Sequence, residues 1–143
     1  MGITIHYSKT LEQTVEEAVE SVEKQLQSRT YTASNALRNS ALSVLRGKGG
    51  GRTYRVPGTN RTYTASAPGE PPAMRTGIFR GSWQPSAHFS SGSYTSRIET
   101  DVGYAGWLEN GTPGGQMDPR PHHERILEHA KPEIIRIYSA PYD

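Results

Sequence analysis

The sequence contains no cysteine, and this absence excludes disulfide bridges, thiolate zinc sites and cysteine nucleophiles. Large apolar residues are also few, because Leu, Ile, Val and Phe together number 23 of 143 residues. A self-sufficient core usually needs about 20% of such residues. Disorder would also require a high net charge, and the formal charge is only +2. We therefore expect one thin folded domain, residues 1–143, that gains further burial from partner subunits.

Long apolar runs are missing as well. No stretch approaches the roughly 18 apolar residues of a membrane span, so we expect none. The first residues do not combine a basic stretch with an apolar one, as a secretory signal would. These absences, together with that of cysteine, indicate a soluble protein that is made and kept inside a cell.

Charge is distributed unevenly along the chain. Residues 1–45 carry a formal charge of −1, residues 46–80 carry +6 and residues 81–143 carry −3. A basic centre between acidic flanks is typical of a surface that contacts phosphate or the acidic face of a neighbouring copy, and the alternative is a solvated loop. The candidate interface residues of this centre are Arg52, Arg55, Arg61, Arg75 and Arg80.

A helical pattern begins after Lys9. One stripe consists of Leu11, Val15, Ala18, Val22 and Leu26, and it resumes with Ala33, Leu37, Ala41 and Val44. This spacing predicts an amphipathic helix that ends near Arg46-Gly47. Ser8 or Thr10 can serve as its N-cap. Thr30-Tyr31-Thr32 is a weak helical stretch, and we favour one long helix over two with a bend.

The segment after this helix is rich in glycine and basic residues. Residues 52–56 and 61–64 flank Pro57-Gly58-Thr59-Asn60, which predicts a β-hairpin within a basic insert at 46–66. A mobile loop is the alternative, because neither arm has an apolar face. The hexapeptide Arg-Thr-Tyr-Thr-Ala-Ser occurs at 29–34 and again at 61–66. The first copy lies in a helical pattern and the second does not, so we do not expect a structural repeat.

The second half of the sequence predicts a sheet and a helix. Thr76 can cap a helical turn, and alternating residues at 83–89 and 94–102 form two strands around a Ser90-Ser91-Gly92-Ser93 turn. Residues 104–109 extend this sheet in our prediction, and residues 3–6 form a further short strand. The last helix starts near His122, with Ile126, Ala130, Ile134 and Ile137 as its stripe. Pro132 is expected to bend or divide it.

These elements predict an α+β fold. A long N-terminal helix and a C-terminal helix pack on one face of a small antiparallel sheet, and the hairpin loop extends from it. Trp83 is expected in the core, whereas Trp107 borders a glycine-rich loop and is as consistent with an interface as with the core.

Catalytic templates are absent. The run His122-His123-Glu124 does not satisfy His-Glu-x-x-His, because Leu127 stands where the second histidine is required. His122 and His129 are seven residues apart and could share a helix face, but a solvated helix start explains them as well. Gly-x-Ser-x-Gly does not occur, and Gly47–Gly51 lacks the spacing of a phosphate-binding loop. We expect no enzymatic activity, catalytic residue, metal or cofactor.

Three segments carry a resemblance to a known family. They are Ala67-Pro68-Gly69-Glu70-Pro71-Pro72 followed by Arg75–Trp83, then Tyr104–Thr112, and then Met117–His122. In order and spacing they resemble the segments APGxPPxxxTGxLRxSI, YAxxxExGT and MxPRPFL of phage head–tail joining proteins. These proteins are neck or tail-completion components of long-tailed double-stranded DNA bacteriophages. The chain departs from the pattern at Phe79, at His122 and His123, and in the basic insert.

The resemblance implies a structural virion protein without catalysis. Its expected fold is a long helix, a small sheet and a second helix. Its expected assembly is a ring of six or twelve copies at the neck, formed in the host bacterial cytoplasm. The implied partners are head-connector and tail-tube or terminator proteins, with contact to packaged DNA also possible. Motif membership adds Glu109 and Arg120, with Trp107, to the candidate interface residues.

Three other functions stay open at this stage. One is a metalloenzyme with zinc held by His122 and His129, which bound zinc after purification without tags would reveal. A tail terminator, which caps the tail tube, shares the fold type and is poorly separated by sequence. A small nucleic-acid-binding module would stack Tyr54 and Tyr63 on bases and place the arginines on phosphates.

Overall fold

The longest element is helix α1, Leu11–Val44, in a computed structural model that describes residues 2–4, 10–47, 49–73 and 77–143. Its N-cap is Thr10, whose Oγ1 accepts from the Gln13 amide while the Gln13 side chain accepts from the Thr10 amide, both at 3.1 Å. This reciprocal pair satisfies two amides that the helix leaves free. The prediction of one long helix is therefore confirmed. Ser8, the other proposed cap, lies outside the described residues.

Strands β3, Gln84–Ser90, and β4, Ser93–Glu99, form an antiparallel ribbon in the predicted place. Ser91 and Gly92 connect them, and Gly92 has a φ of 71°, which suits glycine. β4 ends earlier than predicted, because the Thr100 hydroxyl accepts from the Val102 amide and hydrogen-bonds the Ser82 hydroxyl.

Helix α4, His123–Ser139, starts one residue after the predicted position. Pro132 lies inside it and does not divide it. Three of the four predicted stripe residues, Ile126, Ala130 and Ile137, are buried, and Ile134 is half-buried. This packing holds the helix together across the missing proline amide.

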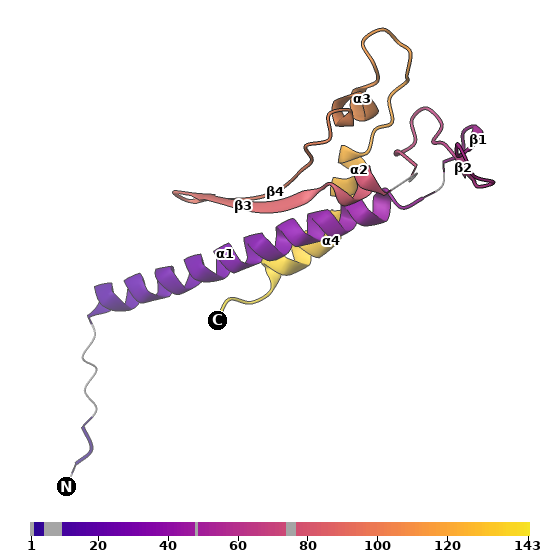
Figure 1. Cartoon of the computed structure of the whole chain (residues 1–143). Coiled ribbons are helices and arrows are strands. Elements are labelled where there is room, and N and C mark those ends of the chain that lie inside the picture. The colour runs from indigo at the N-terminus through magenta and orange to yellow at the C-terminus, as the bar shows by residue number, and fades with distance from the viewer. Residues whose placement is uncertain (1, 5–9, 48, 74–76) are drawn as a thin grey trace.

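α1 lies between the β3–β4 ribbon on one side and α4 on the other (Figure 1). Its buried residues are small, namely Thr30, Ala33, Ser34, Ser40 and Ala41. Small side chains let the neighbouring elements approach the helix closely. They also explain how a chain with few large apolar residues still encloses a core.

The core cluster consists of Ala41, Leu45, Trp83 and Ile126, with Phe79 and Ile98 packed against it. Trp83 is buried, as predicted. Hydrogen bonds also join the layers: the Ser96 hydroxyl donates to the Thr30 carbonyl at 2.9 Å, and the buried Ser40 hydroxyl donates to the Ile126 carbonyl. The α+β arrangement with a long N-terminal helix, a C-terminal helix and small antiparallel sheets is confirmed.

The short elements include two corrections. Residues 104–109 do not extend the sheet: Ala105–Asn110 form helix α3. Ala105 and Leu108 are three residues apart and both partly buried, and Gly111, at a φ of 81°, ends the helix by donating to the Trp107 carbonyl. Residues 3 and 4 are in no strand, and residues 5 and 6 lie outside the described part.

Helix α2, Ile78–Gly81, forms the predicted helical turn, with Gly77 in the N-cap position. Thr76, which we predicted as its cap, lies outside the described residues. None of the helices in the described part of the chain is both long and apolar enough to span a bilayer.

Candidate interface: a basic hairpin and the loops that carry it

The basic insert contains the predicted hairpin, formed by β1, Thr53–Arg55, and β2, Thr62–Thr64. The rings of Tyr54 and Tyr63 face each other across the strands and stack, with centroids 5.6 Å apart. The hydroxyls of Thr53 and Thr64 hydrogen-bond at 3.0 Å on the opposite face. These cross-strand pairs stabilise a hairpin that has no apolar face.

Arg52, Arg55 and Arg61 are all exposed on this hairpin. The Arg52 guanidinium lies 5.5 Å from the centroid of the Tyr54 ring, and Arg55 donates to Asn60 at 2.9 Å. None of the three forms an ion pair with an acidic residue in the described part of the chain. The hairpin therefore presents three cations and an aromatic surface to solvent.

Glu70 joins the hairpin to the rest of the molecule. Its Oε2 accepts from the Gly50 amide at 2.7 Å and from the Ala67 amide at 2.8 Å. These two backbone bonds, with weaker attraction from Arg120 and Arg125, hold the pKa of this carboxyl below its ordinary value. Glu70 belongs to the first of the three family-like segments, but its place in the sequence does not indicate this role.

The glycines at the base of the hairpin allow two backbone segments to come together. Gly51 donates to the Ala65 carbonyl at 2.8 Å, and a Cβ atom at Gly49 or Gly51 would collide with the backbone of Ala65 and Ser66. Backbone packing therefore accounts for Gly49 and Gly51 in this Gly-rich sequence, whose spacing is unlike that of a phosphate-binding loop.

The first and third family-like segments meet beside the hairpin. The Gly69 amide donates to the Pro119 carbonyl at 3.1 Å. Arg120 donates to the carbonyl and the hydroxyl of Ser66, and Arg125 donates to the Gly69 carbonyl. Residues separated by about fifty positions in sequence are thus tied into one layer of loops.

The second segment joins the same layer. The Thr112 amide donates to the Met117 carbonyl at 3.0 Å, the Met117 amide donates to the Thr112 hydroxyl at 2.9 Å, and the Arg120 amide donates to the Leu108 carbonyl. Gly111 lies so close to Met117 that a Cβ atom would be 2.9 Å from its carbonyl oxygen. The three segments of the resemblance therefore form one connected structure.

Glu109 connects α3 to the start of α4. Its Oε2 accepts from the amides of His122, at 2.9 Å, and His123, at 3.3 Å. The same oxygen lies 2.9 Å from Nδ1 of His122, which is also 2.9 Å from the Arg120 carbonyl. α4 has no cap from its own N-cap side chain, so a carboxylate from another helix supplies it.

The buried His122 ring packs edge-to-face with Phe79, 5.3 Å away, and with Trp83, 6.0 Å away. Burial lowers the pKa of His122 below its ordinary value, and this effect outweighs the opposing influence of the Arg120 carbonyl and the Glu109 carboxylate. The ring is therefore neutral near pH 7, with its Nδ1 proton directed at those two acceptors. Its Nε2 has no hydrogen-bond partner among the described residues.

Glu109, His122 and His123 are also the residues that could hold a metal ion, because one ligand atom of each lies within 4.8 Å of the others. The backbone and side-chain bonds of Glu109 already account for this grouping. The pair that the sequence suggested, His122 and His129, does not form such a group among the described residues. His129 instead hydrogen-bonds Ser40 through Nδ1 at 3.0 Å.

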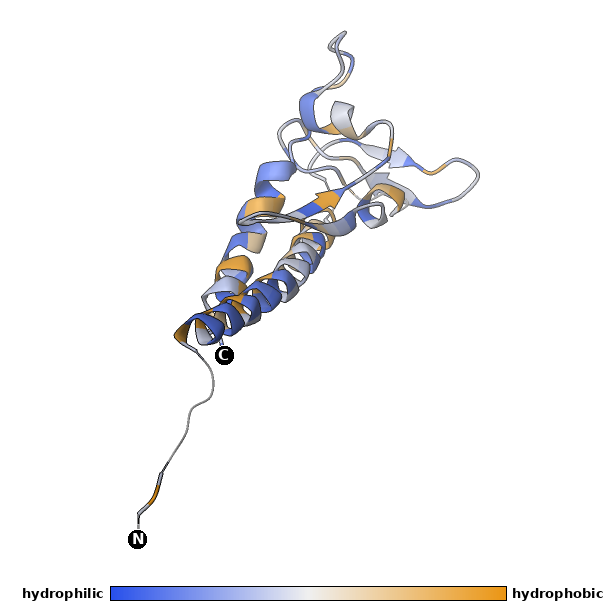
Figure 2. Ribbon diagram, turned by 90° about the vertical axis from the view of Figure 1, so that its left-hand side faces the viewer, coloured by the Kyte–Doolittle hydropathy of each residue, from blue (hydrophilic) through white to orange (hydrophobic). Residues whose placement is uncertain are grey.

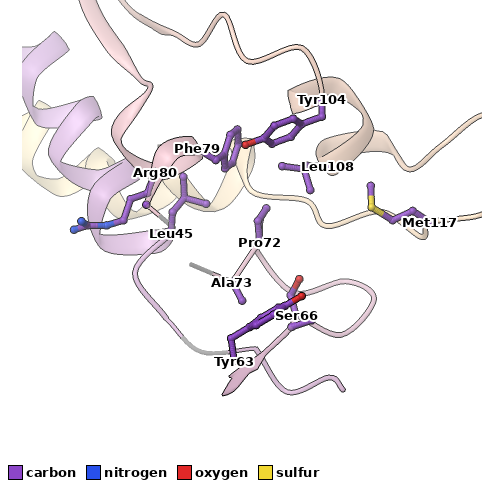
Figure 3. Close-up of a pocket in the computed structure, with 12 residues that line it drawn as sticks. Leu45, Tyr63, Ser66, Pro72, Ala73, Phe79, Arg80, Tyr104, Leu108 and Met117 are labelled. Carbon is purple, nitrogen blue, oxygen red and sulfur yellow. The ribbon is translucent and has the colours of Figure 1, made fainter. Parts of the chain in front are cut away.

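A cavity of about 550 Å³ separates the hairpin from the body of the protein. Figure 3 shows Tyr63 and Ser66 on one wall, Phe79 and Tyr104 on the opposite wall and Pro72 between them. The Arg80 side chain extends away from the cavity in this view, and its Nε donates to the Leu42 carbonyl at 2.8 Å. The described residues that line it are mainly apolar and include no cluster of titratable side chains.

The structure places the remaining candidate residues in different environments. Trp107 is exposed on α3, with 53% of its surface accessible, so it is not a core residue of this chain. Arg80, Glu109 and Arg120 bind other parts of the same chain through the bonds described above. Arg75 lies outside the described residues.

Comparison with protein-family models, with curated proteins and with solved structures finds no match to this chain.

Proposed function

We propose that this chain is a neck protein of a long-tailed bacteriophage, which joins the DNA-filled head to the tail as an oligomeric ring. The single observation that carries the proposal is the connection of the three family-like segments. Gly69, Glu109 and Arg120, which belong to different segments, are linked within one layer of loops. Because hydrogen bonds join the three segments directly, they contribute to one structural feature although they lie far apart in the sequence.

The layer is suited to holding a surface in place, and its described residues form no recognised catalytic arrangement. Its carboxylates and guanidiniums bind backbone groups, as Glu70 does with Gly50 and Arg125 does with Gly69. The basic hairpin that it supports carries Arg52, Arg55 and Arg61 into solvent. In a ring, such a hairpin would contact either an acidic surface of the neighbouring subunit or the DNA in the channel.

Electron microscopy of lysates from a phage that lacks this gene tests the proposal. We expect filled heads beside separate tails of normal length, with joining restored when the gene is supplied in trans. Overlong tails would assign the chain to the tail terminator instead. Normal, infectious particles would refute both roles.

Nucleic-acid binding is a second candidate, favoured by the Tyr54–Tyr63 stack beside Arg52. Aromatic rings next to arginines are suited to bind single strands through stacking and phosphate contacts. The purified chain would then bind DNA with an affinity that falls as salt rises, and deletion of residues 46–66 would abolish binding. Absence of salt-dependent binding would refute this candidate without affecting the neck role.

A further inference from the structure

The N-terminal part of α1 carries an apolar stripe that no other described segment covers. Leu11, Val15, Val19 and Val22 are spaced by four, four and three residues and share one face of the helix. Their exposed fractions are 81%, 53%, 51% and 37%. Single exposed apolar residues are common in soluble proteins, but four in register along one helix indicate a binding surface.

This stripe continues a face that is buried further along the same helix. The C-terminal end of the chain runs beside α1 as far as Gln25, which exchanges two hydrogen bonds of 3.0 Å with the Asp143 backbone. Arg29 donates to the carbonyls of Ile137 and Tyr138 at the end of α4. Residues 11–24 project beyond this cover by about 21 Å at 1.5 Å per residue. Figure 1 shows this part of α1 extending past α4.

Acidic residues border the stripe. Residues 11–24 contain five glutamates and one lysine, and Lys24 pairs with Glu20 at 3.2 Å. At 100° per residue, Glu12, Glu16 and Glu23 fall along one edge of the stripe, whereas Glu20 faces away from it. Figure 2, which views the molecule from this end, shows a mostly hydrophilic helix with hydrophobic positions on it. A suitable partner therefore combines apolar surface with cations.

The hairpin has this combination on one of its two faces. Alternation along the strands places Arg52 and Tyr54 on the same face as Arg61 and Tyr63, and places Arg55 on the opposite face. Tyr54 is exposed, and the Arg52 guanidinium lies above its ring. Residues 46–66 include five basic residues and no acidic one. The hairpin and the stripe lie at opposite ends of α1 (Figure 1), so one copy cannot bring them together.

We propose that the exposed side chains of Arg52, Tyr54 and Arg61 on one copy bind the Leu11–Val22 stripe and its glutamate edge on a second copy of this chain. The inference rests on the proposed function, since it specifies how neighbouring subunits of the ring meet. The two surfaces differ, so the contact is heterologous, and repetition of it closes a ring or extends a filament. Charge complementarity selects this partner over a second stripe, because two stripes would bring their glutamates together.

Sedimentation of the purified full-length chain over a range of concentrations tests this contact. We expect the wild type to self-associate, and Arg61→Glu or Glu23→Arg each to weaken association by about tenfold or more, because like charges then face each other. The matched controls are Lys131→Glu, at an exposed position of α4, and Glu20→Arg, on the side of α1 that faces away from the stripe. Each changes the charge by the same amount and is expected to leave association near the wild-type level.

Mixing the two charge-reversed variants, Arg61→Glu and Glu23→Arg, provides the decisive measurement. In the mixture the altered hairpin of the first variant can face the altered helix of the second, and the unchanged hairpin can face the unchanged helix. The mixture is therefore expected to associate as the wild type does. Val15→Ser with Val22→Ser, which changes no charge, should also weaken association, whereas Gln27→Ser should not. A monomeric wild type, equal effects of target and control variants, or a mixture that fails to associate would each overturn the contact.

Two further outcomes separate the possible explanations. If Arg61→Glu leaves self-association intact but abolishes salt-dependent DNA binding, the hairpin contacts nucleic acid and the proposed contact is wrong. If the contact fails while the deleted phage still accumulates separate heads and tails, only the contact is refuted and the neck role stands. Normal particles from the deleted phage would refute the neck role whatever the sedimentation result.

Discussion

Replacement of Glu109 by alanine is expected to destabilise the fold through the loss of a cap that one helix supplies to another. The carboxylate is 18% exposed and accepts from two amides at the start of α4 and from the His122 ring. Loss of an N-cap costs about 1 kcal/mol, and loss of a negative charge at a helix N-terminus costs about 0.5 kcal/mol. The bond to His122 contributes about 1 kcal/mol more. Because one oxygen makes all these bonds, we expect a combined loss of about 2 kcal/mol.

The assay is thermal and urea unfolding of the full chain, followed by circular dichroism. A loss of about 2 kcal/mol corresponds to a fall in Tm of about 8 °C for a domain of this size. Glu109→Gln keeps an acceptor oxygen but loses the charge, so its Tm should lie between those of wild type and Glu109→Ala. Glu128→Ala is the matched control, because Glu128 is an exposed residue in the second turn of α4, the helix that Glu109 caps.

A wild-type Tm for Glu109→Ala would refute the reasoning. It would mean that water caps α4 as well as the carboxylate does. An equal fall in Tm for Glu128→Ala would also count against it. The loss of stability would then reflect the loss of any acidic charge near the start of α4 and not the specific link from α3.

Further predictions concern pH, the end of α4 and one glycine. Because burial lowers the pKa of His122 in the folded state, the unfolded state binds the proton more readily, and the free energy of unfolding should decrease as pH falls below about 6.5. Urea unfolding between pH 5 and 8 should show a smaller decrease for His122→Phe; an identical pH dependence would contradict this. Arg29→Met should cost about 1–2 kcal/mol by urea unfolding, because it removes bonds to four backbone carbonyls; an unchanged midpoint would contradict it. Gly111→Ala should cost about 1–3 kcal/mol through its positive φ and the nearby Met117 carbonyl, whereas Gly106→Ala, in open space within α3, should be neutral or stabilising by up to about 1 kcal/mol in the same assay.

Periodicity was sufficient to predict the main elements. α1, the β3–β4 ribbon and α4 each have a repeating apolar pattern over at least seven residues, and the basic hairpin has a Pro-Gly turn between two similar arms. Such patterns are local, and they succeed because each element must bury one of its own faces. The segment 104–109 is too short for this argument. Six residues with Ala, Trp and Leu fit a strand or a helix, and only the tertiary structure, which partly buries Ala105 and Leu108, selects the helix.

The loop layer could not be derived from patterns of this kind. Nothing in the spacing of Glu109 and His122 indicates that they form a hydrogen bond, because they are thirteen positions apart and the segment between them has no regular periodicity. The motif resemblance placed Glu109 and Arg120 among the candidates. The structure adds that their side chains hold loops of their own chain together, a distinction that depends on which groups the folded backbone leaves without partners.

The hexapeptide Arg-Thr-Tyr-Thr-Ala-Ser shows which part of the structure follows from the sequence alone and which part requires tertiary contacts. Its neighbours in the sequence were enough to predict that the copy at 29–34 lies in a helix and the copy at 61–66 does not. That the first copy continues α1 without a break depends on tertiary contacts. The Thr30 hydroxyl donates to the Leu26 carbonyl and hydrogen-bonds the Tyr138 hydroxyl, 108 positions away, at 2.9 Å. Threonine is β-branched and only a moderate helix former, so its intrinsic propensity favours the helix weakly. Burial of Thr30 against α4 stabilises the helical conformation at this position.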